Sequence, residues 1–525
     1  MRKTVKKLTA VGLTVTSVLG LVACGSSKGT TSQGTSENKE VTKPDTFTVM
    51  CDGTVVTETN GAEAFYKQLN EATGLDIKWT RPDHASYYDA VANAFNSDDT
   101  MPDVVLLSSD YYALYASNGF LWNMTDAWEH SETKNSGRLI STADNVLSAL
   151  MVNGEDGTKA MYGLSLYRGN GCCTYVKKAW LDKAGIDASK IKDVQMDFNT
   201  YYGYLKQMAQ TMGHYVISSP GFIHPEAPNT NYLPEFYQKA QYTFYKDTSG
   251  KYVDGFAQKE MKEALQRIQT AVNDGVIDKE SVNNSTANAR DKFFSTDPST
   301  ETGVFTYWAG TWANTLKTNL SNKGLDDELI AIKPIKELGA YTERIAPCWC
   351  ITSAAKNPEG IFKYFIDKML DGGDVQMLWT HGAKGTHWDD KAETVTVEKK
   401  EDQPKTYTEG QFHYLPGIEK PDQWQTKNHI DPILSIANFT NGYVGESLIP
   451  EVARENGEFF AENSQVAVPL PMTSELSNNI GDINTARTYV IAQVALGYMT
   501  VDEGMDYYNK TVGSLSNAVL KSLNK

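Results

Sequence analysis

The alternation of short apolar strands with amphipathic helices between residues 46 and 107 constrains the fold of this chain most. Strands are expected over Thr46–Met50, Leu75–Thr80 and Asp103–Leu107, and helices over Gly61–Thr73 and Ser86–Phe95. Strands that are joined through a helix of this length pair in parallel. We therefore expect an α/β fold that begins with a doubly wound parallel sheet.

Ligands of doubly wound sheets bind beyond the carboxyl ends of the strands. Asp52 follows the first expected strand and Asp110 follows the third. Both carboxylates are candidates for binding a hydroxylated ligand, and helix capping is the alternative role for each. The other residues expected at this edge are Cys51, Ser108, Ser109 and Tyr111.

About 480 residues follow residue 44, which is too many for one hydrophobic core, so we expect a second unit. It begins near Tyr162-Gly163. The sequence predicts a further series of helices and strands in this part of the chain. These are helices over Ala179–Gly185 and Lys259–Ile277, a helix capped by Thr200 and closed by Gly213, strands over Tyr215–Ser218, Thr302–Trp308 and Cys348–Thr352, a helix opening at Asn357-Pro358, a polar hairpin over Glu393–Tyr407 and closing helices over Thr485–Leu520.

The amino-terminal segment has the pattern of an export signal. Four basic residues lie within Met1–Lys7, and an uncharged, mostly apolar run over Leu8–Gly20 precedes Leu21-Val22-Ala23-Cys24. This pattern predicts a secretory signal peptide over residues 1–23. The end of the run resembles the lipobox of bacterial lipoproteins, which implies that Cys24 carries acyl chains, palmitate among them. Residues 24–44 are then a lipid anchor and flexible linker, rich in Ser, Thr, Gly, Lys and Glu.

Composition limits the partners of this chain. The formal net charge is −16, so the surface should repel nucleic acid and anionic lipid. Mean hydropathy is −0.43 and no downstream apolar run approaches ~20 residues, so we expect no further membrane contact. Five cysteines besides Cys24 are an odd number, which argues against a disulfide framework and favours buried small hydrophobes over a metal cluster.

No motif in the sequence predicts an enzyme. The chain has no phosphate-binding G-x-x-x-x-G-K-[ST] loop, no H-E-x-x-H zinc pattern and no G-x-S-x-G nucleophile turn. Paired carboxylates for glycoside cleavage are not recognisable from sequence among 65 acidic residues. We therefore expect no catalytic residue, no metal and no cofactor.

Several stretches resemble family 1 extracellular solute-binding proteins, the sugar-binding components of ABC importers, and especially the long lipoprotein members from Gram-positive bacteria. The matching stretches are Tyr175–Gly185, Met261–Asp278, Asp291–Trp312 and His381–Trp388. The chain departs from many long members at Gly213-His214-Tyr215-Val216, where they carry a loop suited to calcium, so we expect no calcium there.

The resemblance implies a two-lobe, periplasmic-binding-protein-like fold of the Venus flytrap, type II class. Lobe 1 is expected to comprise residues 45–166 plus 349–380, and lobe 2 residues 167–348 plus 381–525. Crossing segments are expected near Tyr167–Gly171, Ala346–Ile351 and the loop after Trp379.

Neutral oligosaccharides lay the C–H faces of their rings on aromatic side chains and exchange hydrogen bonds with polar ones. The resemblance places cleft aromatics after the strand that ends at Trp308, which makes Trp308 and Trp312 the first candidates. Core packing is the alternative for each tryptophan. The remaining candidates are Trp349, Trp379, Trp388, Asn170 and Arg168, with His224, Asn229 and Asn231 as possible rim residues.

Together these features imply a lipid-anchored, monomeric protein on the extracellular face of the cell membrane. It would capture a neutral oligosaccharide by lobe closure and deliver it to permease subunits that work with a separate ATPase. Two alternatives stay open: binding of a peptide or other non-sugar solute, and a surface glycoside hydrolase.

Overall fold

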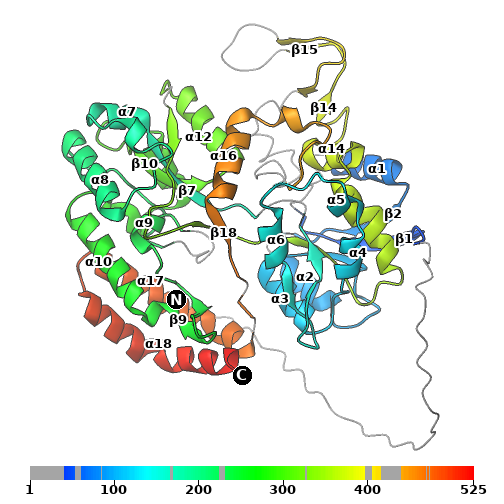
Figure 1. Ribbon diagram of the computed structural model, residues 1–525, viewed down its shortest axis with the longest axis horizontal. Helices are drawn as coiled ribbons and strands as arrows, with labels where there is room; N and C mark the ends of the chain where they lie inside the picture. Colours follow the sequence, from blue (N-terminus) through cyan, green and yellow to red (C-terminus); the bar gives the residue numbers. More distant parts are fainter. Residues whose placement is uncertain are drawn as a thin grey trace, which may run out of the picture. The chain divides into compact units, whose positions relative to one another are not determined.

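The structure is a computed structural model of the whole chain (Figure 1). It describes residues 41–53, 61–83, 86–165, 169–223, 231–325, 328–395, 405–415, 439–468, 470–471 and 473–525. The expected signal peptide, Cys24 and most of the expected linker lie outside these residues, as do Arg168, His224 and Asn229.

The first sheet has five strands in the order β2-β1-β3-β13-β6. β1 (Thr46–Met50) pairs in parallel with β2 (Asp76–Thr80) and with β3 (Val104–Leu107), which confirms the parallel pairing predicted for these segments. The far edge differs from a purely parallel sheet, because β13 (Cys348–Ile351) and β6 (Gly163–Leu164) join it in antiparallel orientation.

Helices of the first part form where the sequence predicts them. α1 (Ala62–Thr73) buries Phe65 and Leu69 on one face and ends at Gly74, whose φ of 63° suits glycine. α2 (Tyr87–Ala94) follows β2. The other helices and strand pairs before Ser165 are α3 (Ser109–Ser117), α4 (Thr125–Glu129), α5 (Glu132–Asn135), α6 (Ala143–Ala149) and the hairpin of β4 (Met151–Asn153) with β5 (Lys159–Met161).

The helix predicted to open at Asn357-Pro358 does so, since the Asn357 side chain accepts a hydrogen bond from the Gly360 N–H. α13 (Pro358–Ile361) is short, and the chain continues as a π-helical turn over Phe362–Ile366 and a 3-10 turn over Asp367–Leu370. α14 (Asp374–His381) follows, then two antiparallel strand pairs: β14 (Trp388–Asp389) with β17 (His413–Tyr414), and β15 (Glu393–Val395) with β16 (Lys405–Tyr407). The second pair is the predicted polar hairpin.

A second sheet has three strands in the order β10-β7-β11. β7 (Cys172–Lys177) lies between β10 (Val304–Trp308) and β11 (Leu329–Ala331), and both neighbours are antiparallel to it. The helices and strand pair of this part are α7 (Lys178–Lys183), α8 (Phe198–Met212), α9 (Pro234–Tyr237), α10 (Lys259–Asn273), α11 (Thr286–Phe293), α12 (Thr311–Asn322) and β8 (Phe244–Lys246) with β9 (Tyr252–Asp254).

Two local predictions in this part are wrong. The residue that caps α8 is Asp197 rather than Thr200, because the Asp197 carboxylate accepts a hydrogen bond from the Thr200 N–H. The segment Tyr215–Ser218 forms no strand; only Ile217 makes isolated bridges, to Ile277 and Val304. The capping carboxylate lies three residues before the residue that the sequence pattern favoured.

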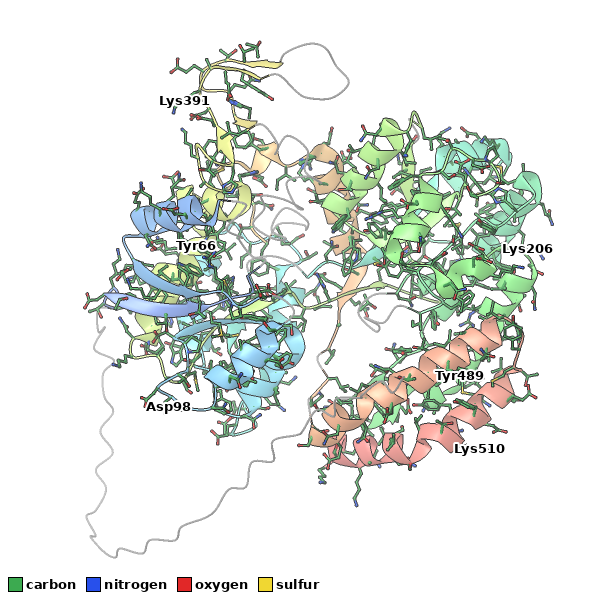
Figure 2. The ribbon with its side chains drawn as sticks, turned by 180° about the vertical axis from the view of Figure 1, so that it is seen from behind. Tyr66, Asp98, Lys206, Lys391, Tyr489 and Lys510 are labelled. Atoms are coloured by element: carbon green, nitrogen blue, oxygen red, sulfur yellow. The ribbon has the colours of Figure 1, made fainter. Side chains whose placement is uncertain are left out.

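Two long helices end the chain, α17 (Ser474–Ala495) and α18 (Val501–Leu523), and they lie side by side in both views (Figures 1 and 2). A buried ion pair joins them to β9, since the Arg487 guanidinium lies 2.9 Å from an Asp254 carboxylate oxygen. The hydroxyls of Tyr508 and Ser516 donate to the other Asp254 oxygen. These bonds attach both helices to the second core.

Two large groups of buried apolar side chains are separate, and the chain passes between them at three places. The first passage runs from Leu164 in the first group to Val176 in the second group. The second passage returns the chain to the first group at Ile345. The third passage runs from Ala453 in the first group to Leu476 in the second group. The third passage includes β18 (Ser464–Val466), which pairs in parallel with β12 (Tyr341–Glu343).

The lobe bounds given by the resemblance stay a prediction. Phe439, Tyr443 and Ile449 pack in the first group of apolar side chains. The third passage therefore lies after Ala453, not in the loop after Trp379.

One carboxylate joins the three passages. Glu343 is fully buried, and its two carboxylate oxygens accept hydrogen bonds from the Gly169 N–H (3.2 Å) and from the Ser464 hydroxyl (3.2 Å). The first passage lies so close that a Cβ at Gly169 would stand 1.4 Å from the Arg344 carbonyl oxygen. Only glycine fits there, and the three backbones are held in one bundle.

Among the described residues, no helix combines the length and apolarity needed to span a membrane. The cysteines of this part, Cys51, Cys172, Cys173, Cys348 and Cys350, are all buried. Burial raises the pKa of the Cys51, Cys173 and Cys348 thiols to about 12, so these side chains stay protonated and pack as small apolar groups.

We predict that Glu343→Ala lowers the free energy of unfolding by about 2–4 kcal/mol, because it leaves the buried Gly169 N–H without its acceptor. Urea unfolding measures the change. Glu71→Ala, on the exposed surface of α1, is the matched control and should change the value by less than about 0.5 kcal/mol. Equal stability of the two variants would show that the buried carboxylate does not stabilise the crossing.

Candidate functional site

Aromatic rings gather at the carboxyl edge of the first sheet. Tyr88 of α2 and Tyr111 of α3 stack with ring centroids 3.9 Å apart and an interplanar angle of 6°. The Tyr88 hydroxyl accepts a hydrogen bond from the Ser108 N–H at the end of β3, and both rings are half-buried. Asp52, which follows β1, is also half-buried and is close enough to raise the pKa of Tyr88, after the larger effect of burial.

A second aromatic group is formed by α1 and the strand β2. The ring of Tyr66, labelled in Figure 2, packs at 4.3 Å from the ring of Trp79, and the Arg81 guanidinium lies 5.0 Å from the Tyr66 ring centroid. The topology β2-β1-β3 thus places aromatic and charged side chains together where ligands of doubly wound sheets bind.

Trp308 ends β10 and is half-buried. The Arg344 guanidinium lies over the indole, 4.6 Å from the ring centroid, and the Arg344 Nε donates to the Gly169 carbonyl. The Tyr175 hydroxyl lies within hydrogen-bond distance of the Trp308 carbonyl and of the Asn456 side-chain oxygen, which also accepts from the Gly310 N–H. Asn456 belongs to α16 (Glu451–Glu462), so this helix fixes the end of β10.

The strand register places Trp308 on a defined face of the second sheet. Trp308 pairs with Cys172 and Thr306 pairs with Thr174, and directly opposed residues of an antiparallel pair share one face. The Thr174 hydroxyl donates to the Glu235 carboxylate of α9, so α9 covers this same face.

A polar pocket opens on this face. Its polar lining combines the amides of Asn231, Gln238 and Gln241 with the Thr342 hydroxyl, above the buried tyrosines Tyr237, Tyr242 and Tyr341. Cys172, Ile223, Pro234, Ala240 and Leu338 complete the wall. None of these described lining residues is charged. Such a lining suits a neutral ligand that presents both hydroxyls and C–H groups.

A buried carboxyl group lies beneath the pocket. Glu235 is 1% exposed, and its Oε1 accepts from the Thr174 hydroxyl (2.8 Å) and from Tyr341 (3.3 Å). Burial raises the pKa of Glu235 to about 7, against the smaller opposing effect of these hydrogen bonds. The group beneath the pocket wall is therefore largely uncharged in mildly acidic solution.

Two of the predicted tryptophans lie in the core. Trp349 and Trp379 are each 2% exposed, and their rings contact one another edge to face at 5.7 Å. Neither indole offers a face to a ligand in this structure, so the packing favours the core alternative for both. Trp349 alternates with Cys348 and Cys350 on β13, but both faces of this strand are covered.

The other two tryptophans keep some surface. Trp312, in the first turn of α12, is half-buried and meets the Tyr307 ring edge to face. Trp388 is half-buried too; it stacks on Phe412, and its indole N–H donates to the Gly382 carbonyl. Trp312 packs against a residue of the sheet face opposite to that of Trp308.

Asn170 is 6% exposed and has a structural position in the crossing. Its φ is 59°, its amide donates to the Ala309 carbonyl, and its side-chain oxygen accepts from the Gly171 N–H. Asp110 is the second residue of α3, and its side chain lies outside the described residues, as does the whole of Arg168.

Sequence reasoning missed Tyr88, Tyr237, Gln238 and Tyr341. Tyrosines at helical spacing look like core residues in sequence. The residues of the pocket come from segments near 172, 237 and 341, and no sequence signal joins them. Asn231, which the sequence suggested as a rim residue, does line the pocket. Among the described residues, no group of three or more His, Cys, Asp or Glu side chains could hold a metal ion.

Comparison with solved structures gives the fold. The chain is similar to an extracellular solute-binding protein family 1 structure from Alicyclobacillus acidocaldarius, at 14% identity and a TM-score of 0.58 over 91% of this chain and 100% of that one. The chain has the two-lobe fold of these solute-binding proteins.

Two further structures have this fold. The N-glycan transport solute-binding protein of Streptococcus pneumoniae matches at 17% identity and a TM-score of 0.57, over 91% of this chain and 98% of that one. The HMO-binding, ABC-transporter-associated solute-binding protein of Bifidobacterium longum infantis matches at 13% identity and a TM-score of 0.55, with the same two coverages. No family model and no curated protein matches the chain.

We predict that Glu235 makes the protein less stable as the pH rises. Its pKa is about 7 in the folded protein and 4.5 ordinarily, so the folded state favours the protonated form. The stability that goes with protonation is fully present below pH 4.5 and is lost as the pH rises through 7, by about 3 kcal/mol.

Glu235→Gln should remove this loss, since the amide oxygen still accepts from Thr174 and carries no charge. Urea unfolding at pH 5 and pH 8 should show the variant more stable than the wild type at pH 8 only. Glu462→Gln, on the exposed surface of α16, is the control. A variant that is less stable at both pH values would contradict the assigned protonation.

Proposed function

We propose that this chain is the solute-binding component of an ABC importer and that it captures a neutral oligosaccharide. The observation that carries the proposal is the uncharged pocket of amides, a hydroxyl and tyrosines on the sheet face that also presents Trp308. The two-lobe fold supports it, because proteins of this fold that are named for glycan transport and HMO binding are among its structural neighbours.

The residues present suit an oligosaccharide for two physical reasons. Aromatic side chains accept the C–H face of a sugar ring, and a stacked aromatic contact contributes about 0.5–1.5 kcal/mol beyond the area that it buries. Amide side chains both donate and accept hydrogen bonds, as sugar hydroxyls do.

The proposal places the ligand between the two lobes. It would contact the second sheet at Trp308 and the pocket, and the first lobe at the carboxyl edge near Asp52 and Tyr111, with Asp110 also at that edge. Contacts with both lobes exist only in a closed state, so they would shift the population towards closure. The closed protein then docks on the permease, and no bond of the ligand is broken.

Location and partners also belong to the proposal. The basic, apolar and Leu-Val-Ala-Cys pattern of residues 1–24 supports export and acylation of Cys24. The protein then acts as a monomer on the extracellular face of the membrane, next to permease subunits whose ATPase is a separate chain. The lipid is the single membrane contact in this arrangement.

Calorimetry against a broad panel of neutral glycans tests the proposed function. We expect at least one oligosaccharide to bind with a micromolar or lower Kd, with a change in intrinsic tryptophan fluorescence. Tight binding of a peptide with no glycan bound would establish the non-sugar alternative. Release of reducing ends from a bound glycan would establish a hydrolase and overturn the proposal.

Two variants refine this experiment. Trp308→Ala should weaken glycan binding about fivefold to tenfold, which corresponds to the loss of one stacked ring. Tyr498→Ala is the control, because Tyr498 is 72% exposed and follows α17 rather than lining the pocket. Equal affinities of both variants and the wild type would remove Trp308 from the site.

We predict that Cys24→Ser abolishes acylation and releases the protein from the membrane. Palmitate labelling and fractionation of expressing cells measure the two effects. The Ser variant should appear unlabelled in the medium, while Cys51→Ser leaves the labelling unchanged. Labelling that persists in Cys24→Ser would contradict the anchor.

A further inference from the structure

Gln238 has a backbone conformation that L side chains rarely adopt. Its φ is 54° and its ψ is −119°, and the Ala240 N–H donates to the Tyr237 carbonyl at 3.0 Å. These values are those of the first central position of a type II′ turn, here in a turn over residues 237–240. Glycine dominates this position, because a Cβ is strained there.

Backbone hydrogen bonds hold the turn, since the Gln238 N–H donates to the Pro234 carbonyl at 2.7 Å, but no side-chain contact accounts for the strain. Of the two other non-glycine residues with positive φ there, Asn170 forms the hydrogen bonds of the crossing and Asp193 is exposed in a turn. The Gln238 amide, by contrast, makes no hydrogen bond to another described residue, although it is half-buried and lines the pocket. A strained residue that persists at a pocket is typical of a functional position.

We propose that Gln238 is a specificity-determining residue that contacts the ligand, and that its backbone strain is retained for this contact. The inference rests on the proposed function. The turn holds the amide at the wall of the pocket, next to the amides of Asn231 and Gln241 and near the Thr342 hydroxyl.

The chemistry of these neighbours defines the ligand group. Asn231 uses its oxygen to accept from the Leu233 N–H, and Gln241 donates to the Lys239 carbonyl, so each is partly satisfied within the protein. Gln238 therefore offers its carbonyl oxygen and its NH₂ together. One acceptor and one donor side by side match two adjacent hydroxyls of a neutral sugar ring. With no charged side chain among the described lining residues, a phosphate or carboxylate group has no charged partner there.

Two variants separate the strain from the contact. Gln238→Gly removes both, so its melting temperature should rise by about 2 °C while its affinity for the tightest-binding glycan of the panel falls about fivefold to tenfold. Gln238→Ala keeps the strain and loses the amide, so it should show the same fall in affinity without the rise. Asp193→Gly is the matched control: it relieves a positive φ away from the pocket and should leave glycan affinity unchanged.

The outcomes are distinguishable. Wild-type protein that binds no glycan would overturn the proposed function and this assignment with it. Wild-type protein that binds while both Gln238 variants bind equally well would overturn the assignment alone. A fall in affinity without a rise in melting temperature for Gln238→Gly would overturn the claim that strain is retained for the contact.

Discussion

The buried carboxylate of Glu343 is the interaction on which the rest of the architecture depends. A polar group without solvent contact is tolerated only where hydrogen bonds satisfy it, and here donors come from the two other passages of the chain, at Gly169 and Ser464. These hydrogen bonds hold together three segments of the chain that are far apart in sequence. The proposed closure of the two lobes would use such a fixed point, because rigid halves move about a few residues rather than throughout the chain.

The candidate site lies next to this crossing, and the sequence neighbours of Glu343 explain why. Tyr341 and Thr342 line the pocket, and Arg344 covers Trp308. The four consecutive residues 341–344 therefore contribute to the pocket wall, to the crossing and to the packing of Trp308. A change in the geometry of the crossing would be transmitted directly to the pocket, because no flexible segment separates them. The buried Glu235 also lies close to these residues, because its carboxyl group accepts a hydrogen bond from the Tyr341 hydroxyl of β12.

Local patterns predicted the first sheet well and the site poorly. The strands at Thr46–Met50 and Val104–Leu107 and the helix closed by Gly74 follow from apolar periodicity and from a glycine stop, which act over a few residues. Residue type alone does not distinguish a stacking tryptophan from a core tryptophan: Trp349 and Trp379 pack against each other, whereas Trp308 retains surface. That difference depends on β13 being covered on both faces, which is a tertiary property. The turn at Gln238 was equally invisible, because glutamine gives no signal for a positive φ.

The candidate pocket differs in charge from the chain as a whole. The chain has a formal net charge of −16, yet the described lining of the pocket has no charged side chain. A negative surface keeps such a protein soluble and repels anions, but it does not attract a neutral solute. For the proposed neutral ligand, selectivity would come from shape and from hydrogen bonds at fixed positions, and an amide that is held in place before the ligand arrives contributes more. The strained turn at Gln238 would hold the amide in this way. A glycine at the same position would relax the backbone, but it would also remove the amide that we propose contacts the ligand.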